Sequence, residues 1–380
     1  MIYELRHFNN VLLKFEYEEV DLNRIIKIIY INSEYKYLLP IGLELSNEGL
    51  MSWLKSRTIP QNREYVNVLL SKMGVNVNDT IGIINLCKGL SLNDSYWIVE
   101  EDFKGSFEEY NLYDNEFSNV LSLIAYTGYG SRRITGVKSS PEFTTNGMLP
   151  KAWRRINGDI LLYKGGTSGF SNTGNEPFSE YFASQIADKM GLNHIRYSLS
   201  NWKKMVCSTC KIFTSKDVSF VPIYKFIESN ENVSNINYMA NYFKELGEEF
   251  YNSFIDMIIF DALIYNTDRH ANNYGLLVDN HTNKVISFAP LFDHGMSLFN
   301  YAVIDDLKNI DQYAKTRTSI YGFDHTDIAK RFITKSQKDQ LKKLIDFKFV
   351  NVPKHITFNN ERKKLLEKFI QKRVIELLNL

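Results

Sequence analysis

The chain has 380 residues, of which 44% are hydrophobic and 23% are charged, and these proportions exclude a wholly disordered protein. At roughly 100–200 residues per domain, this length allows two or three domains or one large two-lobed unit. The 45 Lys and Arg residues against 44 Asp and Glu give a net charge of +1, so we expect no direct binding of nucleic acid.

The cysteine count and the hydropathy pattern favour a reducing compartment. Cys87, Cys207 and Cys210 are too few to form a disulfide framework in a chain of this length. The N-terminus lacks the basic and then apolar pattern of a signal peptide, and the most apolar stretch, 254–265, is short and contains two aspartates. We therefore expect a cytoplasmic protein without a membrane span. Because the sequence has no second Cys-x-x-Cys besides that at 207–210, we expect these two cysteines to pack in a hairpin and not to bind zinc or form a redox pair.

The first 125 residues mix strand-like and helical patterns. Residues 25–31 form an apolar run typical of a strand, and 63–73 carry a helical apolar stripe that ends at Gly74. We interpret 1–125 as an α/β domain whose function the sequence does not indicate. A segment rich in Gly, Ser, Thr and Pro from 126 to 147 marks the start of a second domain.

At the end of this segment, Thr144–Lys151 has features of a phosphate-binding loop. Gly147 would let the backbone approach an anion, and backbone amides can donate to phosphate oxygens. The segment lacks the Gly-Lys-Ser/Thr ending of a Walker A motif, so a plain surface turn remains the alternative reading of these residues alone.

Residues 159–164 predict a strand that ends at Lys164, followed by a loop with four glycines between 165 and 174. A helix then starts near Pro177 and stops at Gly191. ATP-dependent phosphoryl transfer uses a strand lysine on the phosphates and a helical carboxylate that holds this lysine. Lys164 and Glu180 are the candidates; Glu176 competes, but it lies at the helix start, where a carboxylate serves the macrodipole.

Further along the chain, a nearly apolar helix at 250–265 leads into Asn266–Asn273, which reads Asn-Thr-Asp-Arg-His-Ala-Asn-Asn. The strands 274–278 and 285–288 then predict a hairpin, and Asp-His-Gly follows at 293–295. Asp-x-x-x-x-Asn followed by Asp-x-Gly is the order found in protein kinases.

This spacing assigns chemistry to three residues. Asp268 would accept or orient the attacking hydroxyl, while Asn273 and Asp293 would ligate Mg²⁺, since hard oxygen ligands suit Mg²⁺ better than zinc. Asp-x-x-x-x-Asn or Asp-x-Gly alone is weak evidence for a kinase, because either can occur by chance. The inference depends on the two motifs occurring in this order with a hairpin between them.

These motifs resemble those of the HipA-like serine/threonine kinases. The catalytic loop matches Asn266–Asn273, and Pro290–Asp293 matches the Pro-Leu-Tyr/Phe-Asp metal-binding element. Glu180 with the Ile-Ala and Gly-Leu pairs that follow it matches the family's helix pattern, and Thr144–Lys151 is similar to the family's phosphate loop. Specific matches cover about residues 140–300. The first 125 residues do not obviously match the family's N-terminal subdomain.

The resemblance implies an α+β, two-lobed protein-kinase-like fold with an extra N-terminal α/β domain: 1–125, a small lobe at 126–226 and a helical large lobe at 227–380. It implies ATP and Mg²⁺ as cofactors, with Asp268 as the base, Asn273 and Asp293 on the metal, and Lys164, paired with Glu180, on the phosphates. The candidate ATP-contacting residues outside the catalytic loop are Thr144, Gly147, Lys151, Val221 and Tyr224, the last two on the segment expected near adenine.

The family's phosphate loop carries an autophosphorylated serine. Threonine stands at the aligned position here, so we expect autophosphorylation at Thr144 or Thr145, besides transfer to Ser or Thr of a protein substrate. An antitoxin-type protein partner is also implied. A phosphoinositide-like lipid kinase, whose catalytic loop is similar to Asp268–Asn273, and a nucleotide-binding pseudokinase or interaction module remain the alternatives.

Overall fold

The computed structural model describes residues 1–20, 23–130, 139–170 and 172–380, and it divides into two compact units. The first unit comprises Met1–Tyr163, Ile212–Val221 and Leu277–Ile286, and the second comprises Lys164–Lys211, Pro222–Leu276 and Ser287–Leu380. The first unit extends past residue 125 to Tyr163 and includes two short later stretches, so the two units do not coincide with the predicted segments 1–125, 126–226 and 227–380. The turn-rich segment predicted at 126–147 lies partly, at 131–138, outside the described residues.

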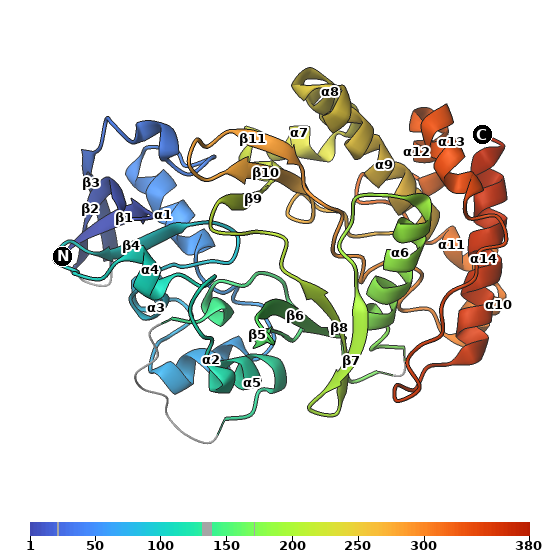
Figure 1. Ribbon diagram of the computed structural model, residues 1–380, viewed down its shortest axis with the longest axis horizontal. Helices are drawn as coiled ribbons and strands as arrows, with labels where there is room; N and C mark the ends of the chain where they lie inside the picture. Colours follow the sequence, from blue (N-terminus) through green and yellow to red (C-terminus); the bar gives the residue numbers. More distant parts are fainter. Residues whose placement is uncertain (21–22, 131–138, 171) are drawn as a thin grey trace. The chain divides into compact units, whose positions relative to one another are not determined.

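The first unit is built on a sheet with the strand order β3-β2-β1-β4 (Figure 1). Its strands are β1 (Ile2–His7), β2 (Asn10–Val20), β3 (Asn23–Ile31) and β4 (Tyr96–Glu100). All neighbouring pairs are antiparallel, with Leu5 opposite Leu13 on one side and Ile98 on the other. These three side chains are buried in one hydrophobic core, as the two-residue alternation of strands requires. The strand predicted at 25–31 is part of β3.

Short helices complete the first unit. They are η1 (Lys36–Leu38), α1 (Asn47–Ser56), α2 (Val66–Met73), α3 (Thr80–Cys87), α4 (Phe107–Tyr110), α5 (Asn119–Thr127) and η2 (Pro141–Phe143). The predicted helix at 63–73 begins only at Val66, because Tyr65 adopts a left-handed conformation at its N-cap. It ends as predicted at Gly74, whose φ of 76° favours glycine.

Most of the remaining strands of the first unit cross its boundaries, so that each of these has residues assigned to both units. β5 (Lys151–Ile156) neighbours β6 (Asp159–Gly165), which contains the predicted strand ending at Lys164. β9 (Val218–Pro222), β10 (Gly275–Asp279) and β11 (Val285–Phe288) form a sheet with the order β11-β10-β9. The predicted hairpin that connects the two kinase motifs is thereby confirmed.

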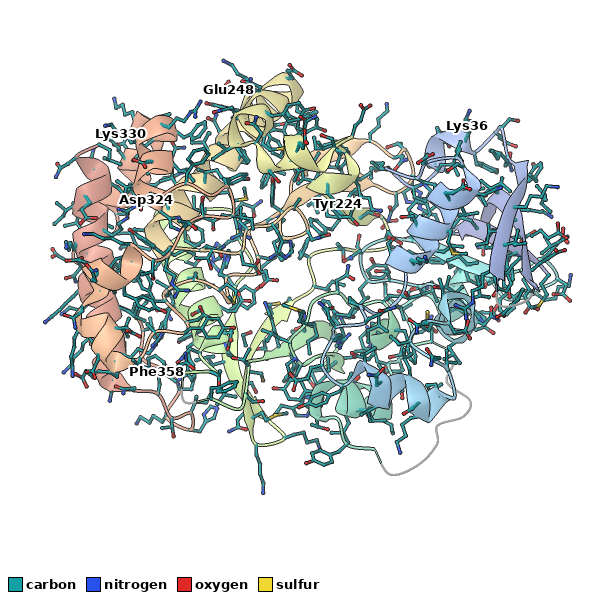
Figure 2. All side chains as sticks on the ribbon, turned by 180° about the vertical axis from the view of Figure 1, so that it is seen from behind. Lys36, Tyr224, Glu248, Asp324, Lys330 and Phe358 are labelled. Atoms are coloured by element: carbon teal, nitrogen blue, oxygen red, sulfur yellow. The ribbon has the colours of Figure 1, made fainter. Side chains whose placement is uncertain are left out.

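The second unit is mainly helical and is organised around α9 (Glu248–Ile264). Every residue of α9 from Met257 to Ile264 is buried, which explains the apolar sequence of the predicted helix. α8 (Ile236–Leu246), α12 (His325–Phe332) and α14 (Asn360–Leu378) pack against it. Figure 2 marks Glu248 at the start of α9 and Asp324, which caps α12 by accepting from the backbone of Thr326. The other helical segments are η3 (Ile223–Lys225), α7 (Asn230–Ser234), α10 (Ile304–Lys308), α11 (Ile310–Ala314) and α13 (Lys335–Lys342).

Two elements at the start of the second unit position the candidate site. α6 (Glu176–Met190) starts with proline in its first turn and stops at Gly191, as predicted. β7 (Ser198–Trp202) and β8 (Met205–Lys211) form an antiparallel hairpin.

Cys207 and Cys210 stand three positions apart on β8, so their side chains point to opposite faces, and this geometry does not suit a shared metal. Among the described residues, no cluster of three His, Cys, Asp or Glu side chains could hold a metal ion.

The fold therefore combines α-helices and β-sheets, which agrees with the predicted α+β class in its content of both. Within the described ranges, none of the helices combines the length and apolar character needed to cross a membrane.

Candidate active site

Lys164, at the end of β6, lies between two acidic side chains of the second unit. Its Nζ is 2.7 Å from Glu180 Oε1 and also contacts Asp293 Oδ1. Lys164 and Glu180 are nearly inaccessible to solvent, whereas the Asp293 side chain is 31% exposed. Burial alone would lower the pKa of the Lys164 ammonium, but the charges of Asp293 and Glu180 outweigh it and raise this pKa. The lysine is thus a fixed positive charge, held in place by α6 on one side and the Asp-x-Gly segment on the other.

The backbone around Asp293 is anchored by two side chains. Glu180 Oε2 accepts a hydrogen bond from the His294 N–H at 2.7 Å, and the Tyr197 hydroxyl oxygen accepts from the Asp293 N–H at 3.1 Å. Asp293 adopts a φ of 57°, a left-handed conformation that is uncommon for a residue with a Cβ. The hydrogen bonds to Glu180 and Tyr197 hold the carboxylate in this orientation, and such outliers cluster at functional sites.

Arg269 connects the catalytic-loop segment to α9 and to the Asp-x-Gly segment. Its Nε and Nη2 each donate to a different oxygen of Asp261 at 2.9 Å, which forms a bidentate pair. Nη1 donates to the backbone oxygens of Asn273 and Phe292, and Nη2 also approaches His294 Nδ1 at 2.9 Å. Arg269 is only 2% exposed, and its side chain joins α9, the catalytic-loop segment and the Asp-x-Gly segment.

Sequence reasoning missed Arg269 and Asp261. A signal for them exists, because a charged residue inside the nearly apolar helix needs a buried partner, and Asp261 precedes Arg269 by eight positions. Tyr197 was also missed, and no motif in the sequence points to it.

Asp268 and Asn273 lie on the loop that follows α9. The Asp268 side chain is 45% exposed, and burial of the remainder raises its pKa although His270 opposes this. Asn273 is buried, and its Nδ2 donates to the Asp268 backbone oxygen at 3.0 Å. This bond fixes the amide orientation, so that Oδ1 is the atom of Asn273 suited to a metal. His270 accepts from the Asn272 N–H at 3.2 Å, and this bond stabilises the loop.

Glu176 has a different position from Glu180. It accepts from the Thr167 N–H at 3.2 Å and from the Thr167 hydroxyl at 2.7 Å, and it thereby closes the glycine-rich loop that precedes α6. A Cβ at Gly166 would lie 2.8 Å from the Gly174 Cα and 2.7 Å from Glu176 Oε2, so this close approach requires glycine. The lysine partner on α6 is therefore Glu180.

The candidate phosphate loop, Thr144–Lys151, belongs to the first unit. The Thr144 hydroxyl is buried and donates to the Leu90 backbone oxygen at 2.7 Å, and the Thr145 hydroxyl donates to Pro141 O at 2.6 Å. Gly147 has a φ of 94°, which disfavours any other residue. Lys151 Nζ donates to the Asn146 backbone oxygen at 2.8 Å, so this side chain closes its own loop.

The two residues expected near adenine belong to different units. Val221 lies in β9 of the first unit, and Tyr224 lies in η3 of the second, where burial raises the pKa of its phenol. The neighbouring Ile223 N–H donates to the Tyr274 backbone oxygen at 3.0 Å, which fixes this part of the second unit next to the catalytic-loop segment.

Several polar side chains of the second unit suit a phosphate group with a bound magnesium ion. Asp293 offers a partly exposed carboxylate and Asn273 an oriented amide oxygen, and Mg²⁺ prefers one or two such oxygen ligands with the rest supplied by phosphate and water. Lys164 brings the positive charge that phosphate oxygens require. The side chains thus fit both the metal and the nucleotide phosphates.

Comparison with known proteins supports this interpretation. No protein-family model matches the chain. The serine/threonine-protein kinase CtkA of Helicobacter pylori (strain J99 / ATCC 700824) is 30% identical in an alignment 165 residues long, which covers 39% of this chain and 49% of CtkA. The chain therefore spans about half the length of this curated relative.

Two solved structures align with this chain. The crystal structure of the H. pylori proinflammatory kinase CtkA aligns with 60% of this chain and 93% of its own, at 22% identity and a TM-score of 0.49. HipA from Shewanella oneidensis MR-1, solved with HipB and operator DNA of that toxin–antitoxin system, aligns over 100% of this chain and 99% of its own, at 11% identity and a TM-score of 0.53. The predicted resemblance to the HipA-like kinases is confirmed by the sequence match to CtkA and the fold match to HipA.

Proposed function

We propose that this protein is an ATP-dependent kinase of the HipA-like type that transfers the γ-phosphoryl group to a Ser or Thr hydroxyl of a protein. The observation that carries the proposal is the position of Lys164 between Glu180 and Asp293. This arrangement puts together the lysine, the helical carboxylate and the Asp-x-Gly carboxylate that phosphoryl transfer uses. The homology to a serine/threonine kinase supports the same reaction.

Each side chain then has a defined task. Lys164 binds phosphate oxygens, and Glu180 fixes its position. Asn273 and Asp293 would hold Mg²⁺, which neutralises charge on the phosphates when it is bound. Asp268, the most solvent-exposed of the acidic groups in the site, orients the acceptor hydroxyl and takes up its proton. The raised pKa of Asp268 moves this carboxylate toward the basicity that a proton acceptor needs.

The proposal extends to the other predicted regions. Residues 126–226 and 227–380 would form the small and large lobes, with Val221 and Tyr224 near adenine and Thr144, Gly147 and Lys151 at the phosphates. The Thr144–Thr145 pair is the proposed autophosphorylation site. Since the fold relative HipA was solved with HipB, an antitoxin-type protein partner is proposed as well.

The decisive experiment is incubation with γ-³²P-ATP and Mg²⁺, with the wild type beside Asp268→Asn. We expect label on the wild-type protein and on a co-expressed or generic protein substrate, and at least about 100-fold slower labelling with Asp268→Asn. Equal labelling of the two proteins would exclude the catalytic assignment. Label on phosphoinositide vesicles and none on protein would favour a lipid kinase, and ATP binding without any transfer would favour a pseudokinase.

A further inference from the structure

Arg63 lies in the N-terminal region, three residues before α2, and its guanidinium is buried in the first unit. Its Nη2 is 3.2 Å from Glu142 Oε2, and both side chains are completely inaccessible to solvent. Because burying two charges is costly, such a pair depends on further hydrogen bonds to its other donors and acceptors. The identity of these further bonds therefore indicates what the pair is for.

The two terminal nitrogens of Arg63 also donate to backbone oxygens in and next to the candidate phosphate loop, whereas its Nε–H has no hydrogen-bond partner among the described residues. Nη1 donates to the oxygens of Glu142 and Thr145, each at 3.1 Å, and Nη2 donates to the Lys151 oxygen at 2.6 Å. One guanidinium thus binds backbone before, within and at the end of Thr144–Lys151. The residues it joins are 79 to 88 positions away in the sequence.

The carbonyl contacts also determine how the loop presents its amides. In a trans peptide the C=O and N–H groups point in opposite directions. Because the Thr145 oxygen points to Arg63, the N–H of Asn146 points away from it. A loop whose carbonyls are bound on one side presents amide donors on the other, and phosphate-binding backbones have this property.

Two more contacts from the N-terminal region hold the same loop. The Glu64 N–H donates to the Met148 backbone oxygen at 2.9 Å, and the Leu90 oxygen accepts the Thr144 hydroxyl at 2.7 Å. On the other side, Glu142 Oε1 accepts the Trp153 N–H at 2.9 Å, which ties the ion pair to β5. The first 125 residues therefore form the frame to which the loop is attached.

We propose that Arg63 is a positioning residue for ATP binding: through its ion pair with Glu142 it fixes Thr144–Lys151 in a phosphate-accepting conformation. This inference rests on the proposed function of that loop. It gives the N-terminal region, for which the sequence indicates no function, a part in the kinase reaction.

The test compares Arg63→Lys with Arg155→Lys. Lysine at 63 keeps the charge beside Glu142, but it cannot reach all the acceptors that the planar guanidinium binds. Arg155 is the matched control, since it donates to three backbone oxygens of the same unit, those of Leu112, Tyr113 and Asn115. Amide hydrogen exchange of 142–151 reports on the loop, and KM and kcat for ATP report on function.

For Arg63→Lys we expect faster exchange in 142–151 and a KM for ATP raised about tenfold, with kcat changed less than about twofold, because Arg63 does not touch the reacting groups. Arg155→Lys should lower stability and leave both the exchange of this loop and the KM unchanged. Unchanged exchange, unchanged KM, or an equal rise of KM in both variants would each overturn the inference.

If the wild-type protein transfers no phosphate, the proposed function is wrong, and this result is distinguishable from a failure of the present inference. In that case the Kd for ATP, measured by equilibrium dialysis, replaces KM. A Kd raised about tenfold in Arg63→Lys alone would still support the positioning role. Wild-type protein that binds no ATP would overturn both proposals.

Discussion

Arg269 Nη2 donates a hydrogen bond to Nδ1 of His294 over 2.9 Å. Because a guanidinium has no acceptor, the imidazole must accept with a lone pair and is therefore neutral. This agrees with the pKa of His294, which burial and the positive charge of Arg269 depress far below its usual value. The contact links the catalytic-loop segment to the Asp-x-Gly segment, and Asp261 fixes the arginine from α9.

Replacing Arg269 should damage catalysis and stability together. Arg269→Lys loses the bidentate pair with Asp261 and the bonds to the loop backbone, so we expect kcat to fall about 10- to 100-fold. The free energy of unfolding should fall by about 2–4 kcal/mol, since Asp261 stays buried with a poorer partner. Activity assays and urea denaturation measure the two effects.

A buried arginine of α14 provides the control for this substitution. Arg362 donates to the backbone oxygens of Ala302 and Phe299 at 2.6 and 2.7 Å, both of which lie outside the catalytic-loop segment. Arg362→Lys should lower stability but leave kcat within about twofold. If both variants lost the same activity, Arg269 would have no specific role in the site.

Lys164 and Glu180 should behave as a coupled pair. Lys164→Met leaves the completely buried Glu180 carboxylate without its cation, so we expect a loss of about 3–5 kcal/mol in stability, lessened where Glu180 takes up a proton. Adding Glu180→Gln removes the unpaired charge, and the amide oxygen can still accept from His294. The double variant should therefore regain most of the stability.

Activity separates the two roles of this pair. In both Lys164→Met and the double variant we expect kcat for phosphate transfer to fall at least about 100-fold, because both lack the positive charge that binds the phosphates. Thermal unfolding and ³²P transfer measured on the same samples provide the check. Wild-type activity in the double variant would show that Lys164 does not bind the phosphates.

Tyr197 should affect the metal requirement. Tyr197→Phe removes the acceptor of the Asp293 N–H, so the carboxylate is held less firmly at the position proposed for Mg²⁺. We expect the Mg²⁺ concentration for half-maximal activity to rise about three- to tenfold, with little change in fold, as a lost hydrogen bond of roughly 1 kcal/mol implies. Tyr181→Phe, which loses a bond to the Asn351 oxygen at 3.4 Å, is the control. An unchanged Mg²⁺ dependence in Tyr197→Phe would contradict this role.

The two threonines of the phosphate loop should differ as phosphoryl acceptors. Both hydroxyls donate to backbone oxygens, that of Thr144 to Leu90 and that of Thr145 to Pro141, but Thr144 is only 6% exposed whereas Thr145 is partly exposed. We expect peptide mapping after ATP exposure to find phosphate first on Thr145, and Thr145→Val to remove most of it. Label that persists in Thr145→Val and disappears in Thr144→Val would instead show that the loop opens to release the buried hydroxyl.

The sequence predicted most of the catalytic elements because they are local. The hairpin between the two kinase motifs and the limits of α6 at Pro177 and Gly191 follow from turn and capping chemistry within a few residues. The Lys164–Glu180 contact was also accessible, since a strand, a glycine-rich loop and one helical turn determine where both side chains lie.

Contacts between distant segments could not be predicted in this way. Nothing near Arg63 in the sequence indicates that its acceptors lie 79 to 88 residues away, and nothing near Tyr197 indicates a bond to a backbone amide 96 positions later. The sequence likewise does not indicate that 212–221 and 277–286 belong to the first unit, which they join through tertiary contacts. Local pattern carries no information about such pairings.

His7 gives the first unit a predictable dependence on pH. This last residue of β1 is 1% exposed, and its ring stacks on Tyr96 with the centroids 4.4 Å apart. Burial lowers the pKa of His7 from 6.5 to about 4. The unfolded chain therefore binds a proton below pH 6.5 that the folded chain excludes, and stability is lost as the pH falls from 6.5 toward 4.

His7→Phe keeps an aromatic ring on Tyr96 and removes this titration. Between pH 7 and pH 4.5 we expect the wild type to lose up to about 3 kcal/mol more unfolding free energy than the variant, because each pKa unit corresponds to about 1.4 kcal/mol. Urea denaturation across this range measures the difference, and all other histidines are present in both proteins. His355→Gln, which changes an exposed side chain, controls for the loss of a histidine as such. If His7→Phe kept the wild-type pH dependence, His7 would have to remain protonated within the folded sheet, and a carboxylate such as Asp94 would have to outweigh its burial.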